Sequence, residues 1–200
     1  MLLKMETLNH CHVEAERAWL FHSEDTQSTE EEYLHLLHSL VLCLKPERVL
    51  ETGSFRGLGT CVIARALKSN ELGHLTSLEV VPRVADWARE LLRVNALNEW
   101  ADVLVENSLE FLSTTDQKFD FALFDSMIPL RCQELTICLD RGLLKTGDMV
   151  ALHDTSRVRT ITPGVPDPQT PQLWKEIEAF SRIKFVEFPF SRGLVLAQIL

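Results

Sequence analysis

Three glycines within seven residues constrain the fold of this chain more than any other feature. Gly53, Gly57 and Gly59 follow the segment 49–52, in which apolar residues lead to the acidic Glu51, and a helix-compatible run at 60–67 follows them. This order is typical of a first strand, a tight loop and a helix that packs back on the strand. Glycine accepts a positive φ, and because it has no Cβ a ligand can approach the backbone closely. We therefore predict a ligand-binding loop at the carboxyl end of a strand in an α/β sheet.

Strands and helices are expected to alternate along the chain after this loop. Apolar runs predict strands at 49–52, 74–79, 101–105, 119–124 and 148–152. Helical spacing predicts helices at 60–67, from Pro82 through Leu92, a short one through Phe111 and Leu112, and one at 130–144. Such alternation predicts a parallel sheet with helices on both faces.

The C-terminal part of the chain has a different composition. The segment 161–171 contains four prolines and one glycine, so it can form neither a helix nor a central strand. A loop of this length is a lid, a binding loop or disordered. A helix is expected at 171–180. Strands at 185–190 and 194–199 flank a short connection that contains Gly193, which predicts an antiparallel hairpin.

Residues 1–48 precede the first strand and are expected to form an N-terminal helical cap, with the main domain at 49–200. A first helix is expected over Met5–Leu20. A second helix follows the pattern Ser28-Thr29-Glu30-Glu31, which resembles a capped start, and it carries an apolar stripe from Tyr33 to Leu44. Two roles stay open for this segment: a lid over the site, or plain packing.

The charge balance argues against some partners. The chain has 200 residues, with 20 basic and 29 acidic side chains and a formal net charge of −9. Sequence-independent binding to nucleic acid depends on clusters of Lys and Arg, so no nucleic-acid partner is expected. No apolar run reaches membrane-spanning length, and the five cysteines lack a CxxC pair and are expected to be buried free thiols. We predict a cytoplasmic protein with a small-molecule partner and no membrane contact; a homo-oligomer is compatible with this.

The glycine loop is similar to the loops of two families. Glu51-x-Gly53-x-x-x-Gly57 resembles motif I of the class I S-adenosylmethionine (SAM) methyltransferases, and the overlapping string through Gly59 resembles the nucleotide loop of short-chain dehydrogenases. Residues 46–200 as a whole resemble the methyltransferase sheet. The resemblance implies a doubly wound, Rossmann-like, seven-stranded and mostly parallel α/β sheet with an antiparallel C-terminal hairpin, preceded by the N-terminal helices.

The dehydrogenase alternative fails on its chemistry. That family needs a tyrosine as acid and base, with a lysine four residues later, both far downstream of the loop. This chain has one tyrosine, Tyr33, which lies upstream of the loop, and Leu37 is the fourth residue after it. Hydride transfer of that type is therefore excluded, while a different enzyme for an adenosine dinucleotide stays open.

The methyltransferase resemblance implies SAM as cofactor. Glu79 ends the second strand, where a carboxylate can accept hydrogen bonds from both ribose hydroxyls of an adenosine cofactor. Glu51 is placed near the amino-acid portion of SAM. Asn107 and Ser108 end the third strand near adenine, although either could instead cap the next helix. The residues expected to bind the cofactor are Glu51, Gly53, Ser54, Phe55, Gly57, Glu79, Val80, Asn107, Ser108 and Asp125.

A second resemblance lies where the fourth and fifth strands end, at Asp125 and at His153-Asp154-Thr155. The sequence around them is similar to a branch of small-molecule O-methyltransferases, some of which bind a divalent cation through acids at these strand ends. The resemblance implies Asp125 and Asp154 as ligands for Mg²⁺ or another divalent cation, which would lower the pKa of a substrate hydroxyl. Thr155 departs from the asparagine of catechol-type relatives, and Ser126-Met127-Ile128-Pro129 lacks the usual His or Lys.

The residues expected to take part in catalysis are Asp125, His153 and Asp154. His153 is the nearest base, because the ordinary pKa of histidine lies close to working pH. Alternation along a strand sends His153 and Asp154 to opposite faces, so only one of them is expected to point into the site. Without a metal, Asp125 would contact the cofactor amine or the substrate.

From these features we predict a SAM-dependent methyltransferase that acts on a small molecule, at oxygen. The sulfonium of SAM is already activated, so the protein mainly aligns the reactants, and a strong catalytic motif is not required. Two alternatives stay open: a catalytically silent SAM-fold binding protein, and another adenosine-dinucleotide enzyme. Methylation of nucleic acid is disfavoured by the charge and by the lack of an Asn/Asp-Pro-Pro-aromatic motif after the fourth strand.

Overall fold

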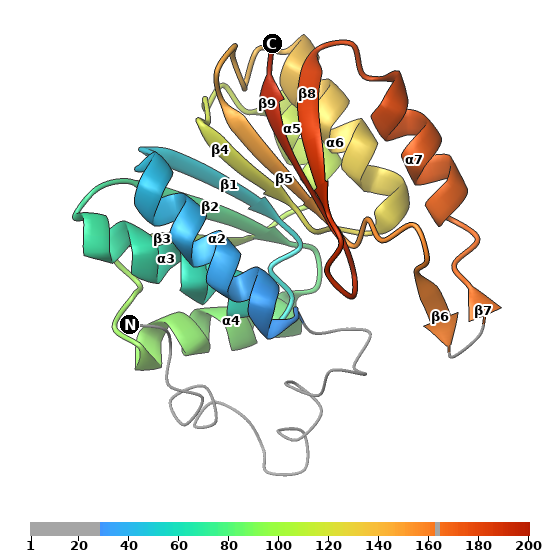
Figure 1. The fold of residues 1–200 in the computed structure, drawn as a ribbon. Coiled ribbons are helices and arrows are strands. Elements are labelled where there is room, and N and C mark those ends of the chain that lie inside the picture. The colour runs from blue at the N-terminus through green and yellow to red at the C-terminus, as the bar shows by residue number, and fades with distance from the viewer. Residues whose placement is uncertain (1–28, 163–164) are drawn as a thin grey trace.

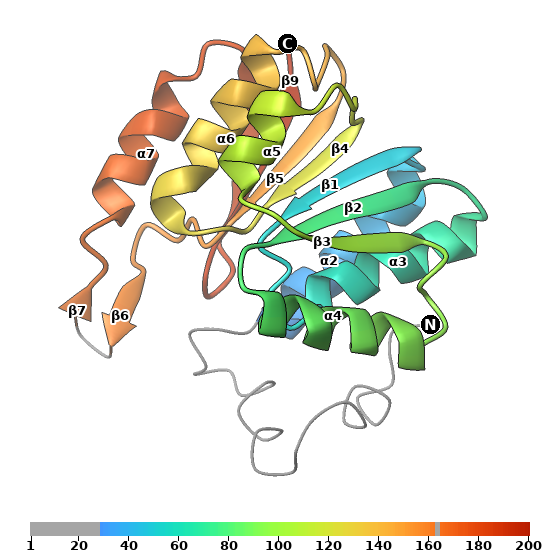
Figure 2. The same cartoon turned by 180° about the vertical axis from the view of Figure 1, so that it is seen from behind.

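A seven-stranded sheet lies between two layers of helices in the computed structural model, which describes residues 29–162 and 165–200 (Figure 1). The strands of the sheet are β1 (Arg48–Thr52), β2 (His74–Glu79), β3 (Ala101–Val105), β4 (Phe121–Phe124), β5 (Met149–His153), β8 (Ile183–Phe188) and β9 (Leu194–Ile199). One face carries α2 (Glu31–Leu44), α3 (Leu58–Asn70) and α4 (Pro82–Val94). The other face carries α5 (Ser108–Thr114), α6 (Ile128–Asp140) and α7 (Thr170–Ala179), as Figure 2 shows from behind.

The strand order is β3-β2-β1-β4-β5-β9-β8. The pairs among β1 to β5 are parallel, whereas β9 runs antiparallel to β5 and β8 runs antiparallel to β9. The predicted doubly wound sheet with an antiparallel hairpin is confirmed. Because the chain winds outward in opposite directions from β1 and β4, the carboxyl ends of these two neighbours form the position where such sheets bind ligands.

The core follows the period of two along each strand. In β4, Phe121 and Leu123 pack in the cluster beneath α2, α3 and α4, while Ala122 and Phe124 pack in the cluster beneath α5, α6 and α7. All four side chains are fully buried. Strands covered on both faces consist of continuous apolar residues, which is why these segments were recognisable as short apolar runs.

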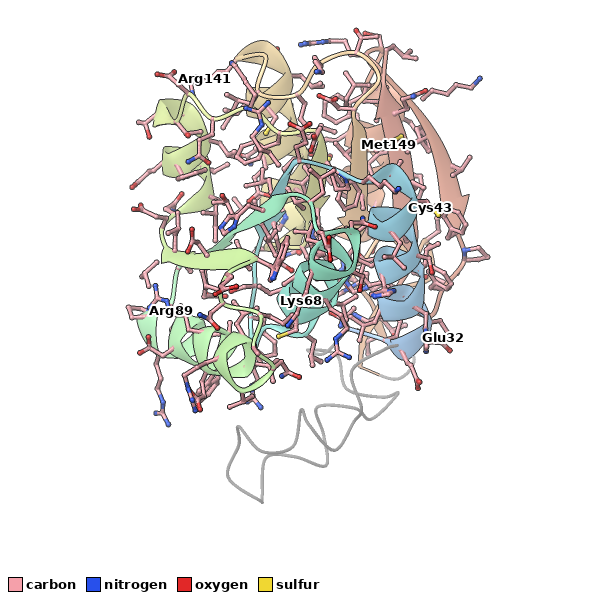
Figure 3. All side chains as sticks on the ribbon, turned by 90° about the vertical axis from the view of Figure 1, so that its left-hand side faces the viewer. Glu32, Cys43, Lys68, Arg89, Arg141 and Met149 are labelled. Atoms are coloured by element: carbon pink, nitrogen blue, oxygen red, sulfur yellow. The ribbon has the colours of Figure 1, made fainter. Side chains whose placement is uncertain are left out.

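Helix α2 packs in the helical layer on one face of the sheet. It lies beside α3, and Figure 3 shows it with Glu32 and Cys43 near its two ends. Tyr33, Leu37 and Val41 are fully buried in the core. The packing role therefore describes this helix, whereas the helix expected over Met5–Leu20 lies outside the described residues.

The start of α2 differs from the predicted capping pattern. Glu30 is the N-cap residue, but its side chain makes no capping hydrogen bond. Its carboxylate instead accepts hydrogen bonds from His153 Nε2 at 2.9 Å and from Arg192 N at 3.0 Å. A long-range contact therefore replaces the local one.

The proline-rich segment forms a small structure of its own. β6 (Thr160–Thr162) and β7 (Val165–Pro166) pair as a two-stranded ribbon that is separate from the main sheet (Figure 1). The prediction that this segment contains no central strand agrees with the ribbon, because Pro166 lacks a backbone donor and is tolerated at an edge.

Cysteine placement corrects one expectation. Cys61, Cys132 and Cys138 are buried free thiols, but Cys43 is free and exposed on α2. In the part of the chain that the structure describes, no helix is long and apolar enough to cross a membrane.

A substitution in α2 tests its place in the core. Leu37→Ala should lower the free energy of unfolding by about 2–5 kcal/mol, because it leaves a cavity between α2 and α3. Leu44→Ala is the matched control, since Leu44 is 41% exposed at the end of the same helix and should change that energy by less than about 1 kcal/mol. Urea denaturation measures both variants. Equal small effects would show that α2 does not pack as described.

Candidate active site

A cavity of about 830 Å³ opens where β1, β2, β4 and β5 end. Its wall includes Thr29, which precedes α2, and Asp167, Pro168 and Gln169, which follow the ribbon. The predicted residues that line it are Glu51, Gly53, Ser54, Phe55, Glu79, Val80, Asn107, Ser108, Asp125 and Asp154. Gly57 and His153 were also predicted for the site, but they do not line the cavity.

The glycine loop lies directly on the ends of two neighbouring strands. The N–H groups of Gly53 and Ser54 donate to Leu78 O in β2, at 2.9 and 3.1 Å. Gly53 has φ 83°, and a Cβ built on it would lie 2.5 Å from the backbone oxygen of Asp125. A larger residue would therefore clash with backbone, which cannot move aside.

Ser54 provides a second feature of this loop. Its side chain is buried in the cavity wall, and among the described residues its hydroxyl has no hydrogen-bond partner. A buried hydroxyl without a partner costs free energy, so this wall is suited to a polar ligand that supplies one.

Gly57 has a packing role that explains why it lies outside the cavity. It is the N-cap of α3 with φ 87°, and a Cβ at this position would lie 2.8 Å from Ala88 Cα in α4. The glycine thus allows α3 and α4 to approach closely.

Glu79 is fixed by the backbone on both sides of it. Its Oε2 accepts from Phe55 N and its Oε1 accepts from Val81 N, each at 3.0 Å. Each carboxylate oxygen has a further lone pair. The side chain is held in the cavity wall with acceptor capacity left for a ligand.

Glu51 is committed to groups inside the fold. Its Oε2 accepts hydrogen bonds from the hydroxyls of Thr60 and Ser77, both at 2.5 Å, and it is 2% exposed. Burial raises the pKa of Glu51 to about 7, although the two hydroxyls work in the opposite direction. It joins β1, β2 and α3 at the edge of the cavity.

At the end of the third strand, the helix-capping role is observed for Asn107. Asn107 caps α5, because its Oδ1 accepts from the N–H groups of Leu109 and Glu110 at 3.0 and 3.2 Å. Ser108 instead donates its hydroxyl proton to the carboxylate of Glu134. Both residues also line the cavity.

Glu134 accepts hydrogen bonds from three hydroxyl groups beside the cavity. It is fully buried in α6 and accepts from Thr52, Ser108 and Ser126. Burial raises the pKa of Glu134, and the three hydroxyl donors work against this shift. Ser108 and Ser126 both line the cavity and donate their hydroxyl protons to Glu134, so their oxygens retain acceptor capacity.

The ends of β4 and β5 bring three ionisable groups together. Ligand atoms of Asp125, His153 and Asp154 all lie within 4.8 Å of one another. Strand alternation predicts that only one of His153 and Asp154 points into the site. β5 ends at His153 and Asp154 has φ 58°, so the two side chains still lie close to each other. Only Asp154 of these two lines the cavity.

His153 is locked inside the protein. Its Nδ1 lies 3.0 Å from Asp125 Oδ1, its Nε2 lies 2.9 Å from Glu30 Oε2, and its ring stacks on Tyr33 with centroids 4.4 Å apart. Burial favours a lower pKa of His153, but the carboxylates of Asp125, Asp154 and Glu30 outweigh it and raise the pKa to about 9. The ring is therefore charged at neutral pH and is hydrogen-bonded through both of its nitrogens. A charged ring has no lone pair left to take a proton, so His153 does not suit the role of general base.

Asp154 is surrounded by three arginines that were not among the predicted site residues. Arg131 Nη2 lies 3.0 Å from its Oδ2, Arg192 donates to both oxygens at 2.5 and 2.8 Å, and Arg159 Nη1 contacts Oδ1. Burial opposes the charged form, but His153 and the three guanidinium groups hold the pKa of Asp154 well below its usual range.

A divalent cation does not fit this arrangement. Asp125, His153 and Asp154 provide donor atoms at metal spacing, yet both oxygens of Asp154 already bind guanidinium groups. A divalent cation placed among three guanidinium groups would be repelled by their positive charges.

The sequence contained a signal for some of the missed residues. Ile128, Cys132 and Leu135 form the buried stripe of α6, and Arg131 and Glu134 fall inside it as buried charged residues. A charge on an apolar face is rarely left unpaired, so both positions could have been selected. Arg159, Arg192 and Glu30 lie in loops or at a helix start, where the sequence carries no such signal.

A family model described as a methyltransferase domain matches residues 50–155. The chain belongs to the methyltransferase domain family. The match includes every residue that was predicted to bind a cofactor or take part in catalysis. Glu30, Arg159 and Arg192 lie outside the matched range. Some of the charged residues around His153 and Asp154 therefore belong to segments that flank this range.

Solved structures resemble this methyltransferase domain chain over nearly its whole length. PaMTH1, a methyltransferase of Podospora anserina with bound S-adenosylhomocysteine (SAH), has 15% identity and a TM-score of 0.80, with 98% of this chain and 86% of that chain covered. The O-methyltransferase TomG of Streptomyces achromogenes, in complex with SAM, has 21% identity and a TM-score of 0.76, with coverages of 100% and 92%. An O-methyltransferase of Bacillus cereus in complex with SAH has 22% identity and a TM-score of 0.76, with coverages of 100% and 93%. No curated protein matches the chain significantly.

His153 should give the protein a measurable pH dependence. A pKa raised from 6.5 to about 9 by folding means that the charged ring stabilises the fold fully below pH 6.5, and that this stabilisation is lost as the pH rises through 9. The difference in unfolding free energy between wild type and His153→Gln should therefore shrink by about 3 kcal/mol between pH 6 and pH 10. Leu44→Ala, which removes no ionisable group from α2, is the control and should give a flat difference. A flat difference for His153→Gln as well would contradict the ion pairs.

Proposed function

We propose that the protein is a SAM-dependent methyltransferase that transfers a methyl group to a hydroxyl of a small molecule. The observation that carries the proposal is that the Gly53 loop and the Glu79 carboxylate form one wall of a single cavity, joined by the hydrogen bond from Phe55 N to Glu79 Oε2. Family membership supports methyl transfer. The bound SAM or SAH of similar structures and the description of TomG and the Bacillus cereus protein as O-methyltransferases support the cofactor and the target atom.

The cofactor wall divides into regions of different chemistry. Glu79 would accept hydrogen bonds from the two ribose hydroxyls. The bare backbone at Gly53 and the hydroxyl of Ser54 would hold the methionyl part, while Phe55 and Val80 add apolar surface. Ser108 and Asn107 lie toward the adenine end, where the Ser108 oxygen would accept from the adenine amino group. Glu51 supports the loop from behind through Thr60 and Ser77.

The acceptor end would use Asp125. Its Oδ1 binds His153 and Arg131, but no described residue donates to its Oδ2. SAM supplies an activated methyl group on a sulfonium when bound. Asp125 Oδ2 would orient the acceptor hydroxyl and take its proton, with the cofactor amine as a second partner, while His153 and Asp154 position Asp125. Asp167 to Gln169 would close this end against water.

The net charge and the free cysteines support the proposed partner and location. The net charge of −9 supports a small-molecule acceptor over nucleic acid. Cys43, Cys61, Cys132 and Cys138 are free, which supports a reducing, cytoplasmic location.

A catalytically silent SAM-binding module is the second candidate. The observation that favours it is the locked state of two of the three predicted catalytic residues, His153 between two carboxylates and Asp154 among three arginines. Only Asp125 then remains to take a proton.

Calorimetric titration with SAM and with NAD, followed by SAH release over a panel of hydroxylated acceptors, tests the proposal. We expect SAM to bind, NAD not to bind, and at least one acceptor to release SAH. Binding of NAD in place of SAM would overturn the cofactor assignment. SAM binding without SAH release from any acceptor would favour the silent module.

Glu79 gives the sharpest single substitution. Glu79→Ala should weaken SAM binding by about 1–3 kcal/mol, because two buried hydrogen bonds to ribose are lost. Glu110→Ala, on the exposed surface of α5, is the matched control and should bind SAM as wild type does. Calorimetry measures both, and circular dichroism checks that they fold. Unchanged affinity in a folded Glu79→Ala protein would remove this residue from the ribose site.

A further inference from the structure

The guanidinium group of Arg131 joins the two acids at the ends of β4 and β5. Its Nη2 lies 3.3 Å from Asp125 Oδ1 and 3.0 Å from Asp154 Oδ2. Nε donates to Ser126 O at 2.9 Å, and Nη1 donates to His153 O. The side chain is only 3% exposed. A single cation therefore bridges both carboxylates and both strand ends.

The other arginines complete the coordination of Asp154. Oδ1 is bound by Arg192 Nε and by Arg159 Nη1, and Oδ2 by Arg192 Nη2 and Arg131 Nη2. Arg159 is held in turn by Asp167, at 2.9 Å from Nε to Oδ2. The arginines come from α6, from the segment before the ribbon and from the β8–β9 turn, so three separate parts of the chain converge on one carboxylate.

We propose that Arg131 is the resident cation of this site and takes the position between Asp125 and Asp154 that a divalent metal ion would need. This inference rests on the proposed function, and it makes the methyl transfer independent of metal. Arg131 acts as a positioning residue: its planar, permanently charged group holds Asp125 with Oδ2 toward the cavity. The acceptor end then presents guanidinium N–H donors, where a metal would present open coordination positions.

Exposure within the cluster agrees with this assignment. The side chains of Arg159 and Arg192 are 18% and 17% exposed, while that of Asp154 is 5% exposed beneath them. An incoming hydrated cation would meet the positive layer before it reached the carboxylate. A cation between Asp125 and Asp154 would have to displace Arg131, whose charge-assisted hydrogen bonds to both carboxylates would then be lost together.

Manganese titration of the full-length wild-type protein tests the inference without any acceptor. Mn²⁺ is followed by electron paramagnetic resonance and calorimetry, with and without SAH. We expect no binding tighter than about 1 mM, the weak end of oxygen-ligand sites. A tight Mn²⁺ site that disappears in Asp154→Asn would overturn the inference, because the metal position would then be accessible in the native protein.

A substitution separates a resident cation from plain structural pairing. Arg131→Ala opens the position between the carboxylates, and we expect Mn²⁺ to bind this variant roughly tenfold or more tightly than wild type. Methylguanidinium should compete with Mn²⁺, whereas urea, which has a similar shape without the charge, should not. A folded variant that binds Mn²⁺ no better than wild type, or that responds equally to urea, would overturn the inference. If the variant does not fold, the wild-type titration decides.

The two proposals fail in different ways. If the proposed function is wrong, the protein will not bind SAM. The Mn²⁺ titration of the wild-type protein can still be interpreted in that case, because it does not depend on SAM binding. Loss of the Arg131 assignment would be seen as Mn²⁺ binding in a protein that still binds SAM. Activity that survives exhaustive dialysis against a chelator supports the assignment, and activity restored only by a divalent cation contradicts it.

Discussion

The close contact between the Gly53 peptide and the ends of two neighbouring strands is the constraint on which the site depends. Gly53 and Ser54 bind Leu78 O of β2, and Gly53 leaves no room for a Cβ beside Asp125 O. These contacts fix the loop against the sheet, and the loop lines the cavity. Phe55 N of the same loop donates a hydrogen bond to Glu79, so this short loop fixes the position of the Glu79 carboxylate as well as its own backbone. Any ligand must fit this fixed wall.

The opposite end of the cavity is organised by charge. Glu30, Asp125, Asp154 and Asp167 balance His153 and three arginines, and most of these groups are nearly inaccessible to water. A buried charged group is stable only when it has partners of opposite charge. Removing one partner leaves the remaining group as an uncompensated buried charge, which destabilises the protein. For this reason His153 is held in its charged form between carboxylates, and it has a structural role in place of the predicted role of base.

How much the sequence could predict depends on whether the signal was local. The β1 loop, the parallel strands and the C-terminal hairpin follow from apolar runs and glycines, which act within a few residues. The role of Glu30 could not be read, because its partners His153 and Arg192 are more than a hundred residues away in the chain. Strand alternation could not show that His153 and Asp154 lie in one cluster, because a left-handed backbone at Asp154 ends the strand. The buried positions of Arg131 and Glu134 in α6 were recognisable, but their partners were not.

The central claim is that an adenosyl ligand binds along the Gly53 loop with its ribose on Glu79. A crystal structure of the full-length protein with SAH tests it most directly. The account predicts both ribose hydroxyls within hydrogen-bonding distance of the Glu79 carboxylate, the amino-acid part against Gly53 and Ser54, and the sulfur facing Asp125. SAH bound elsewhere, or bound in this cavity with Glu79 turned away from the ribose, would contradict it.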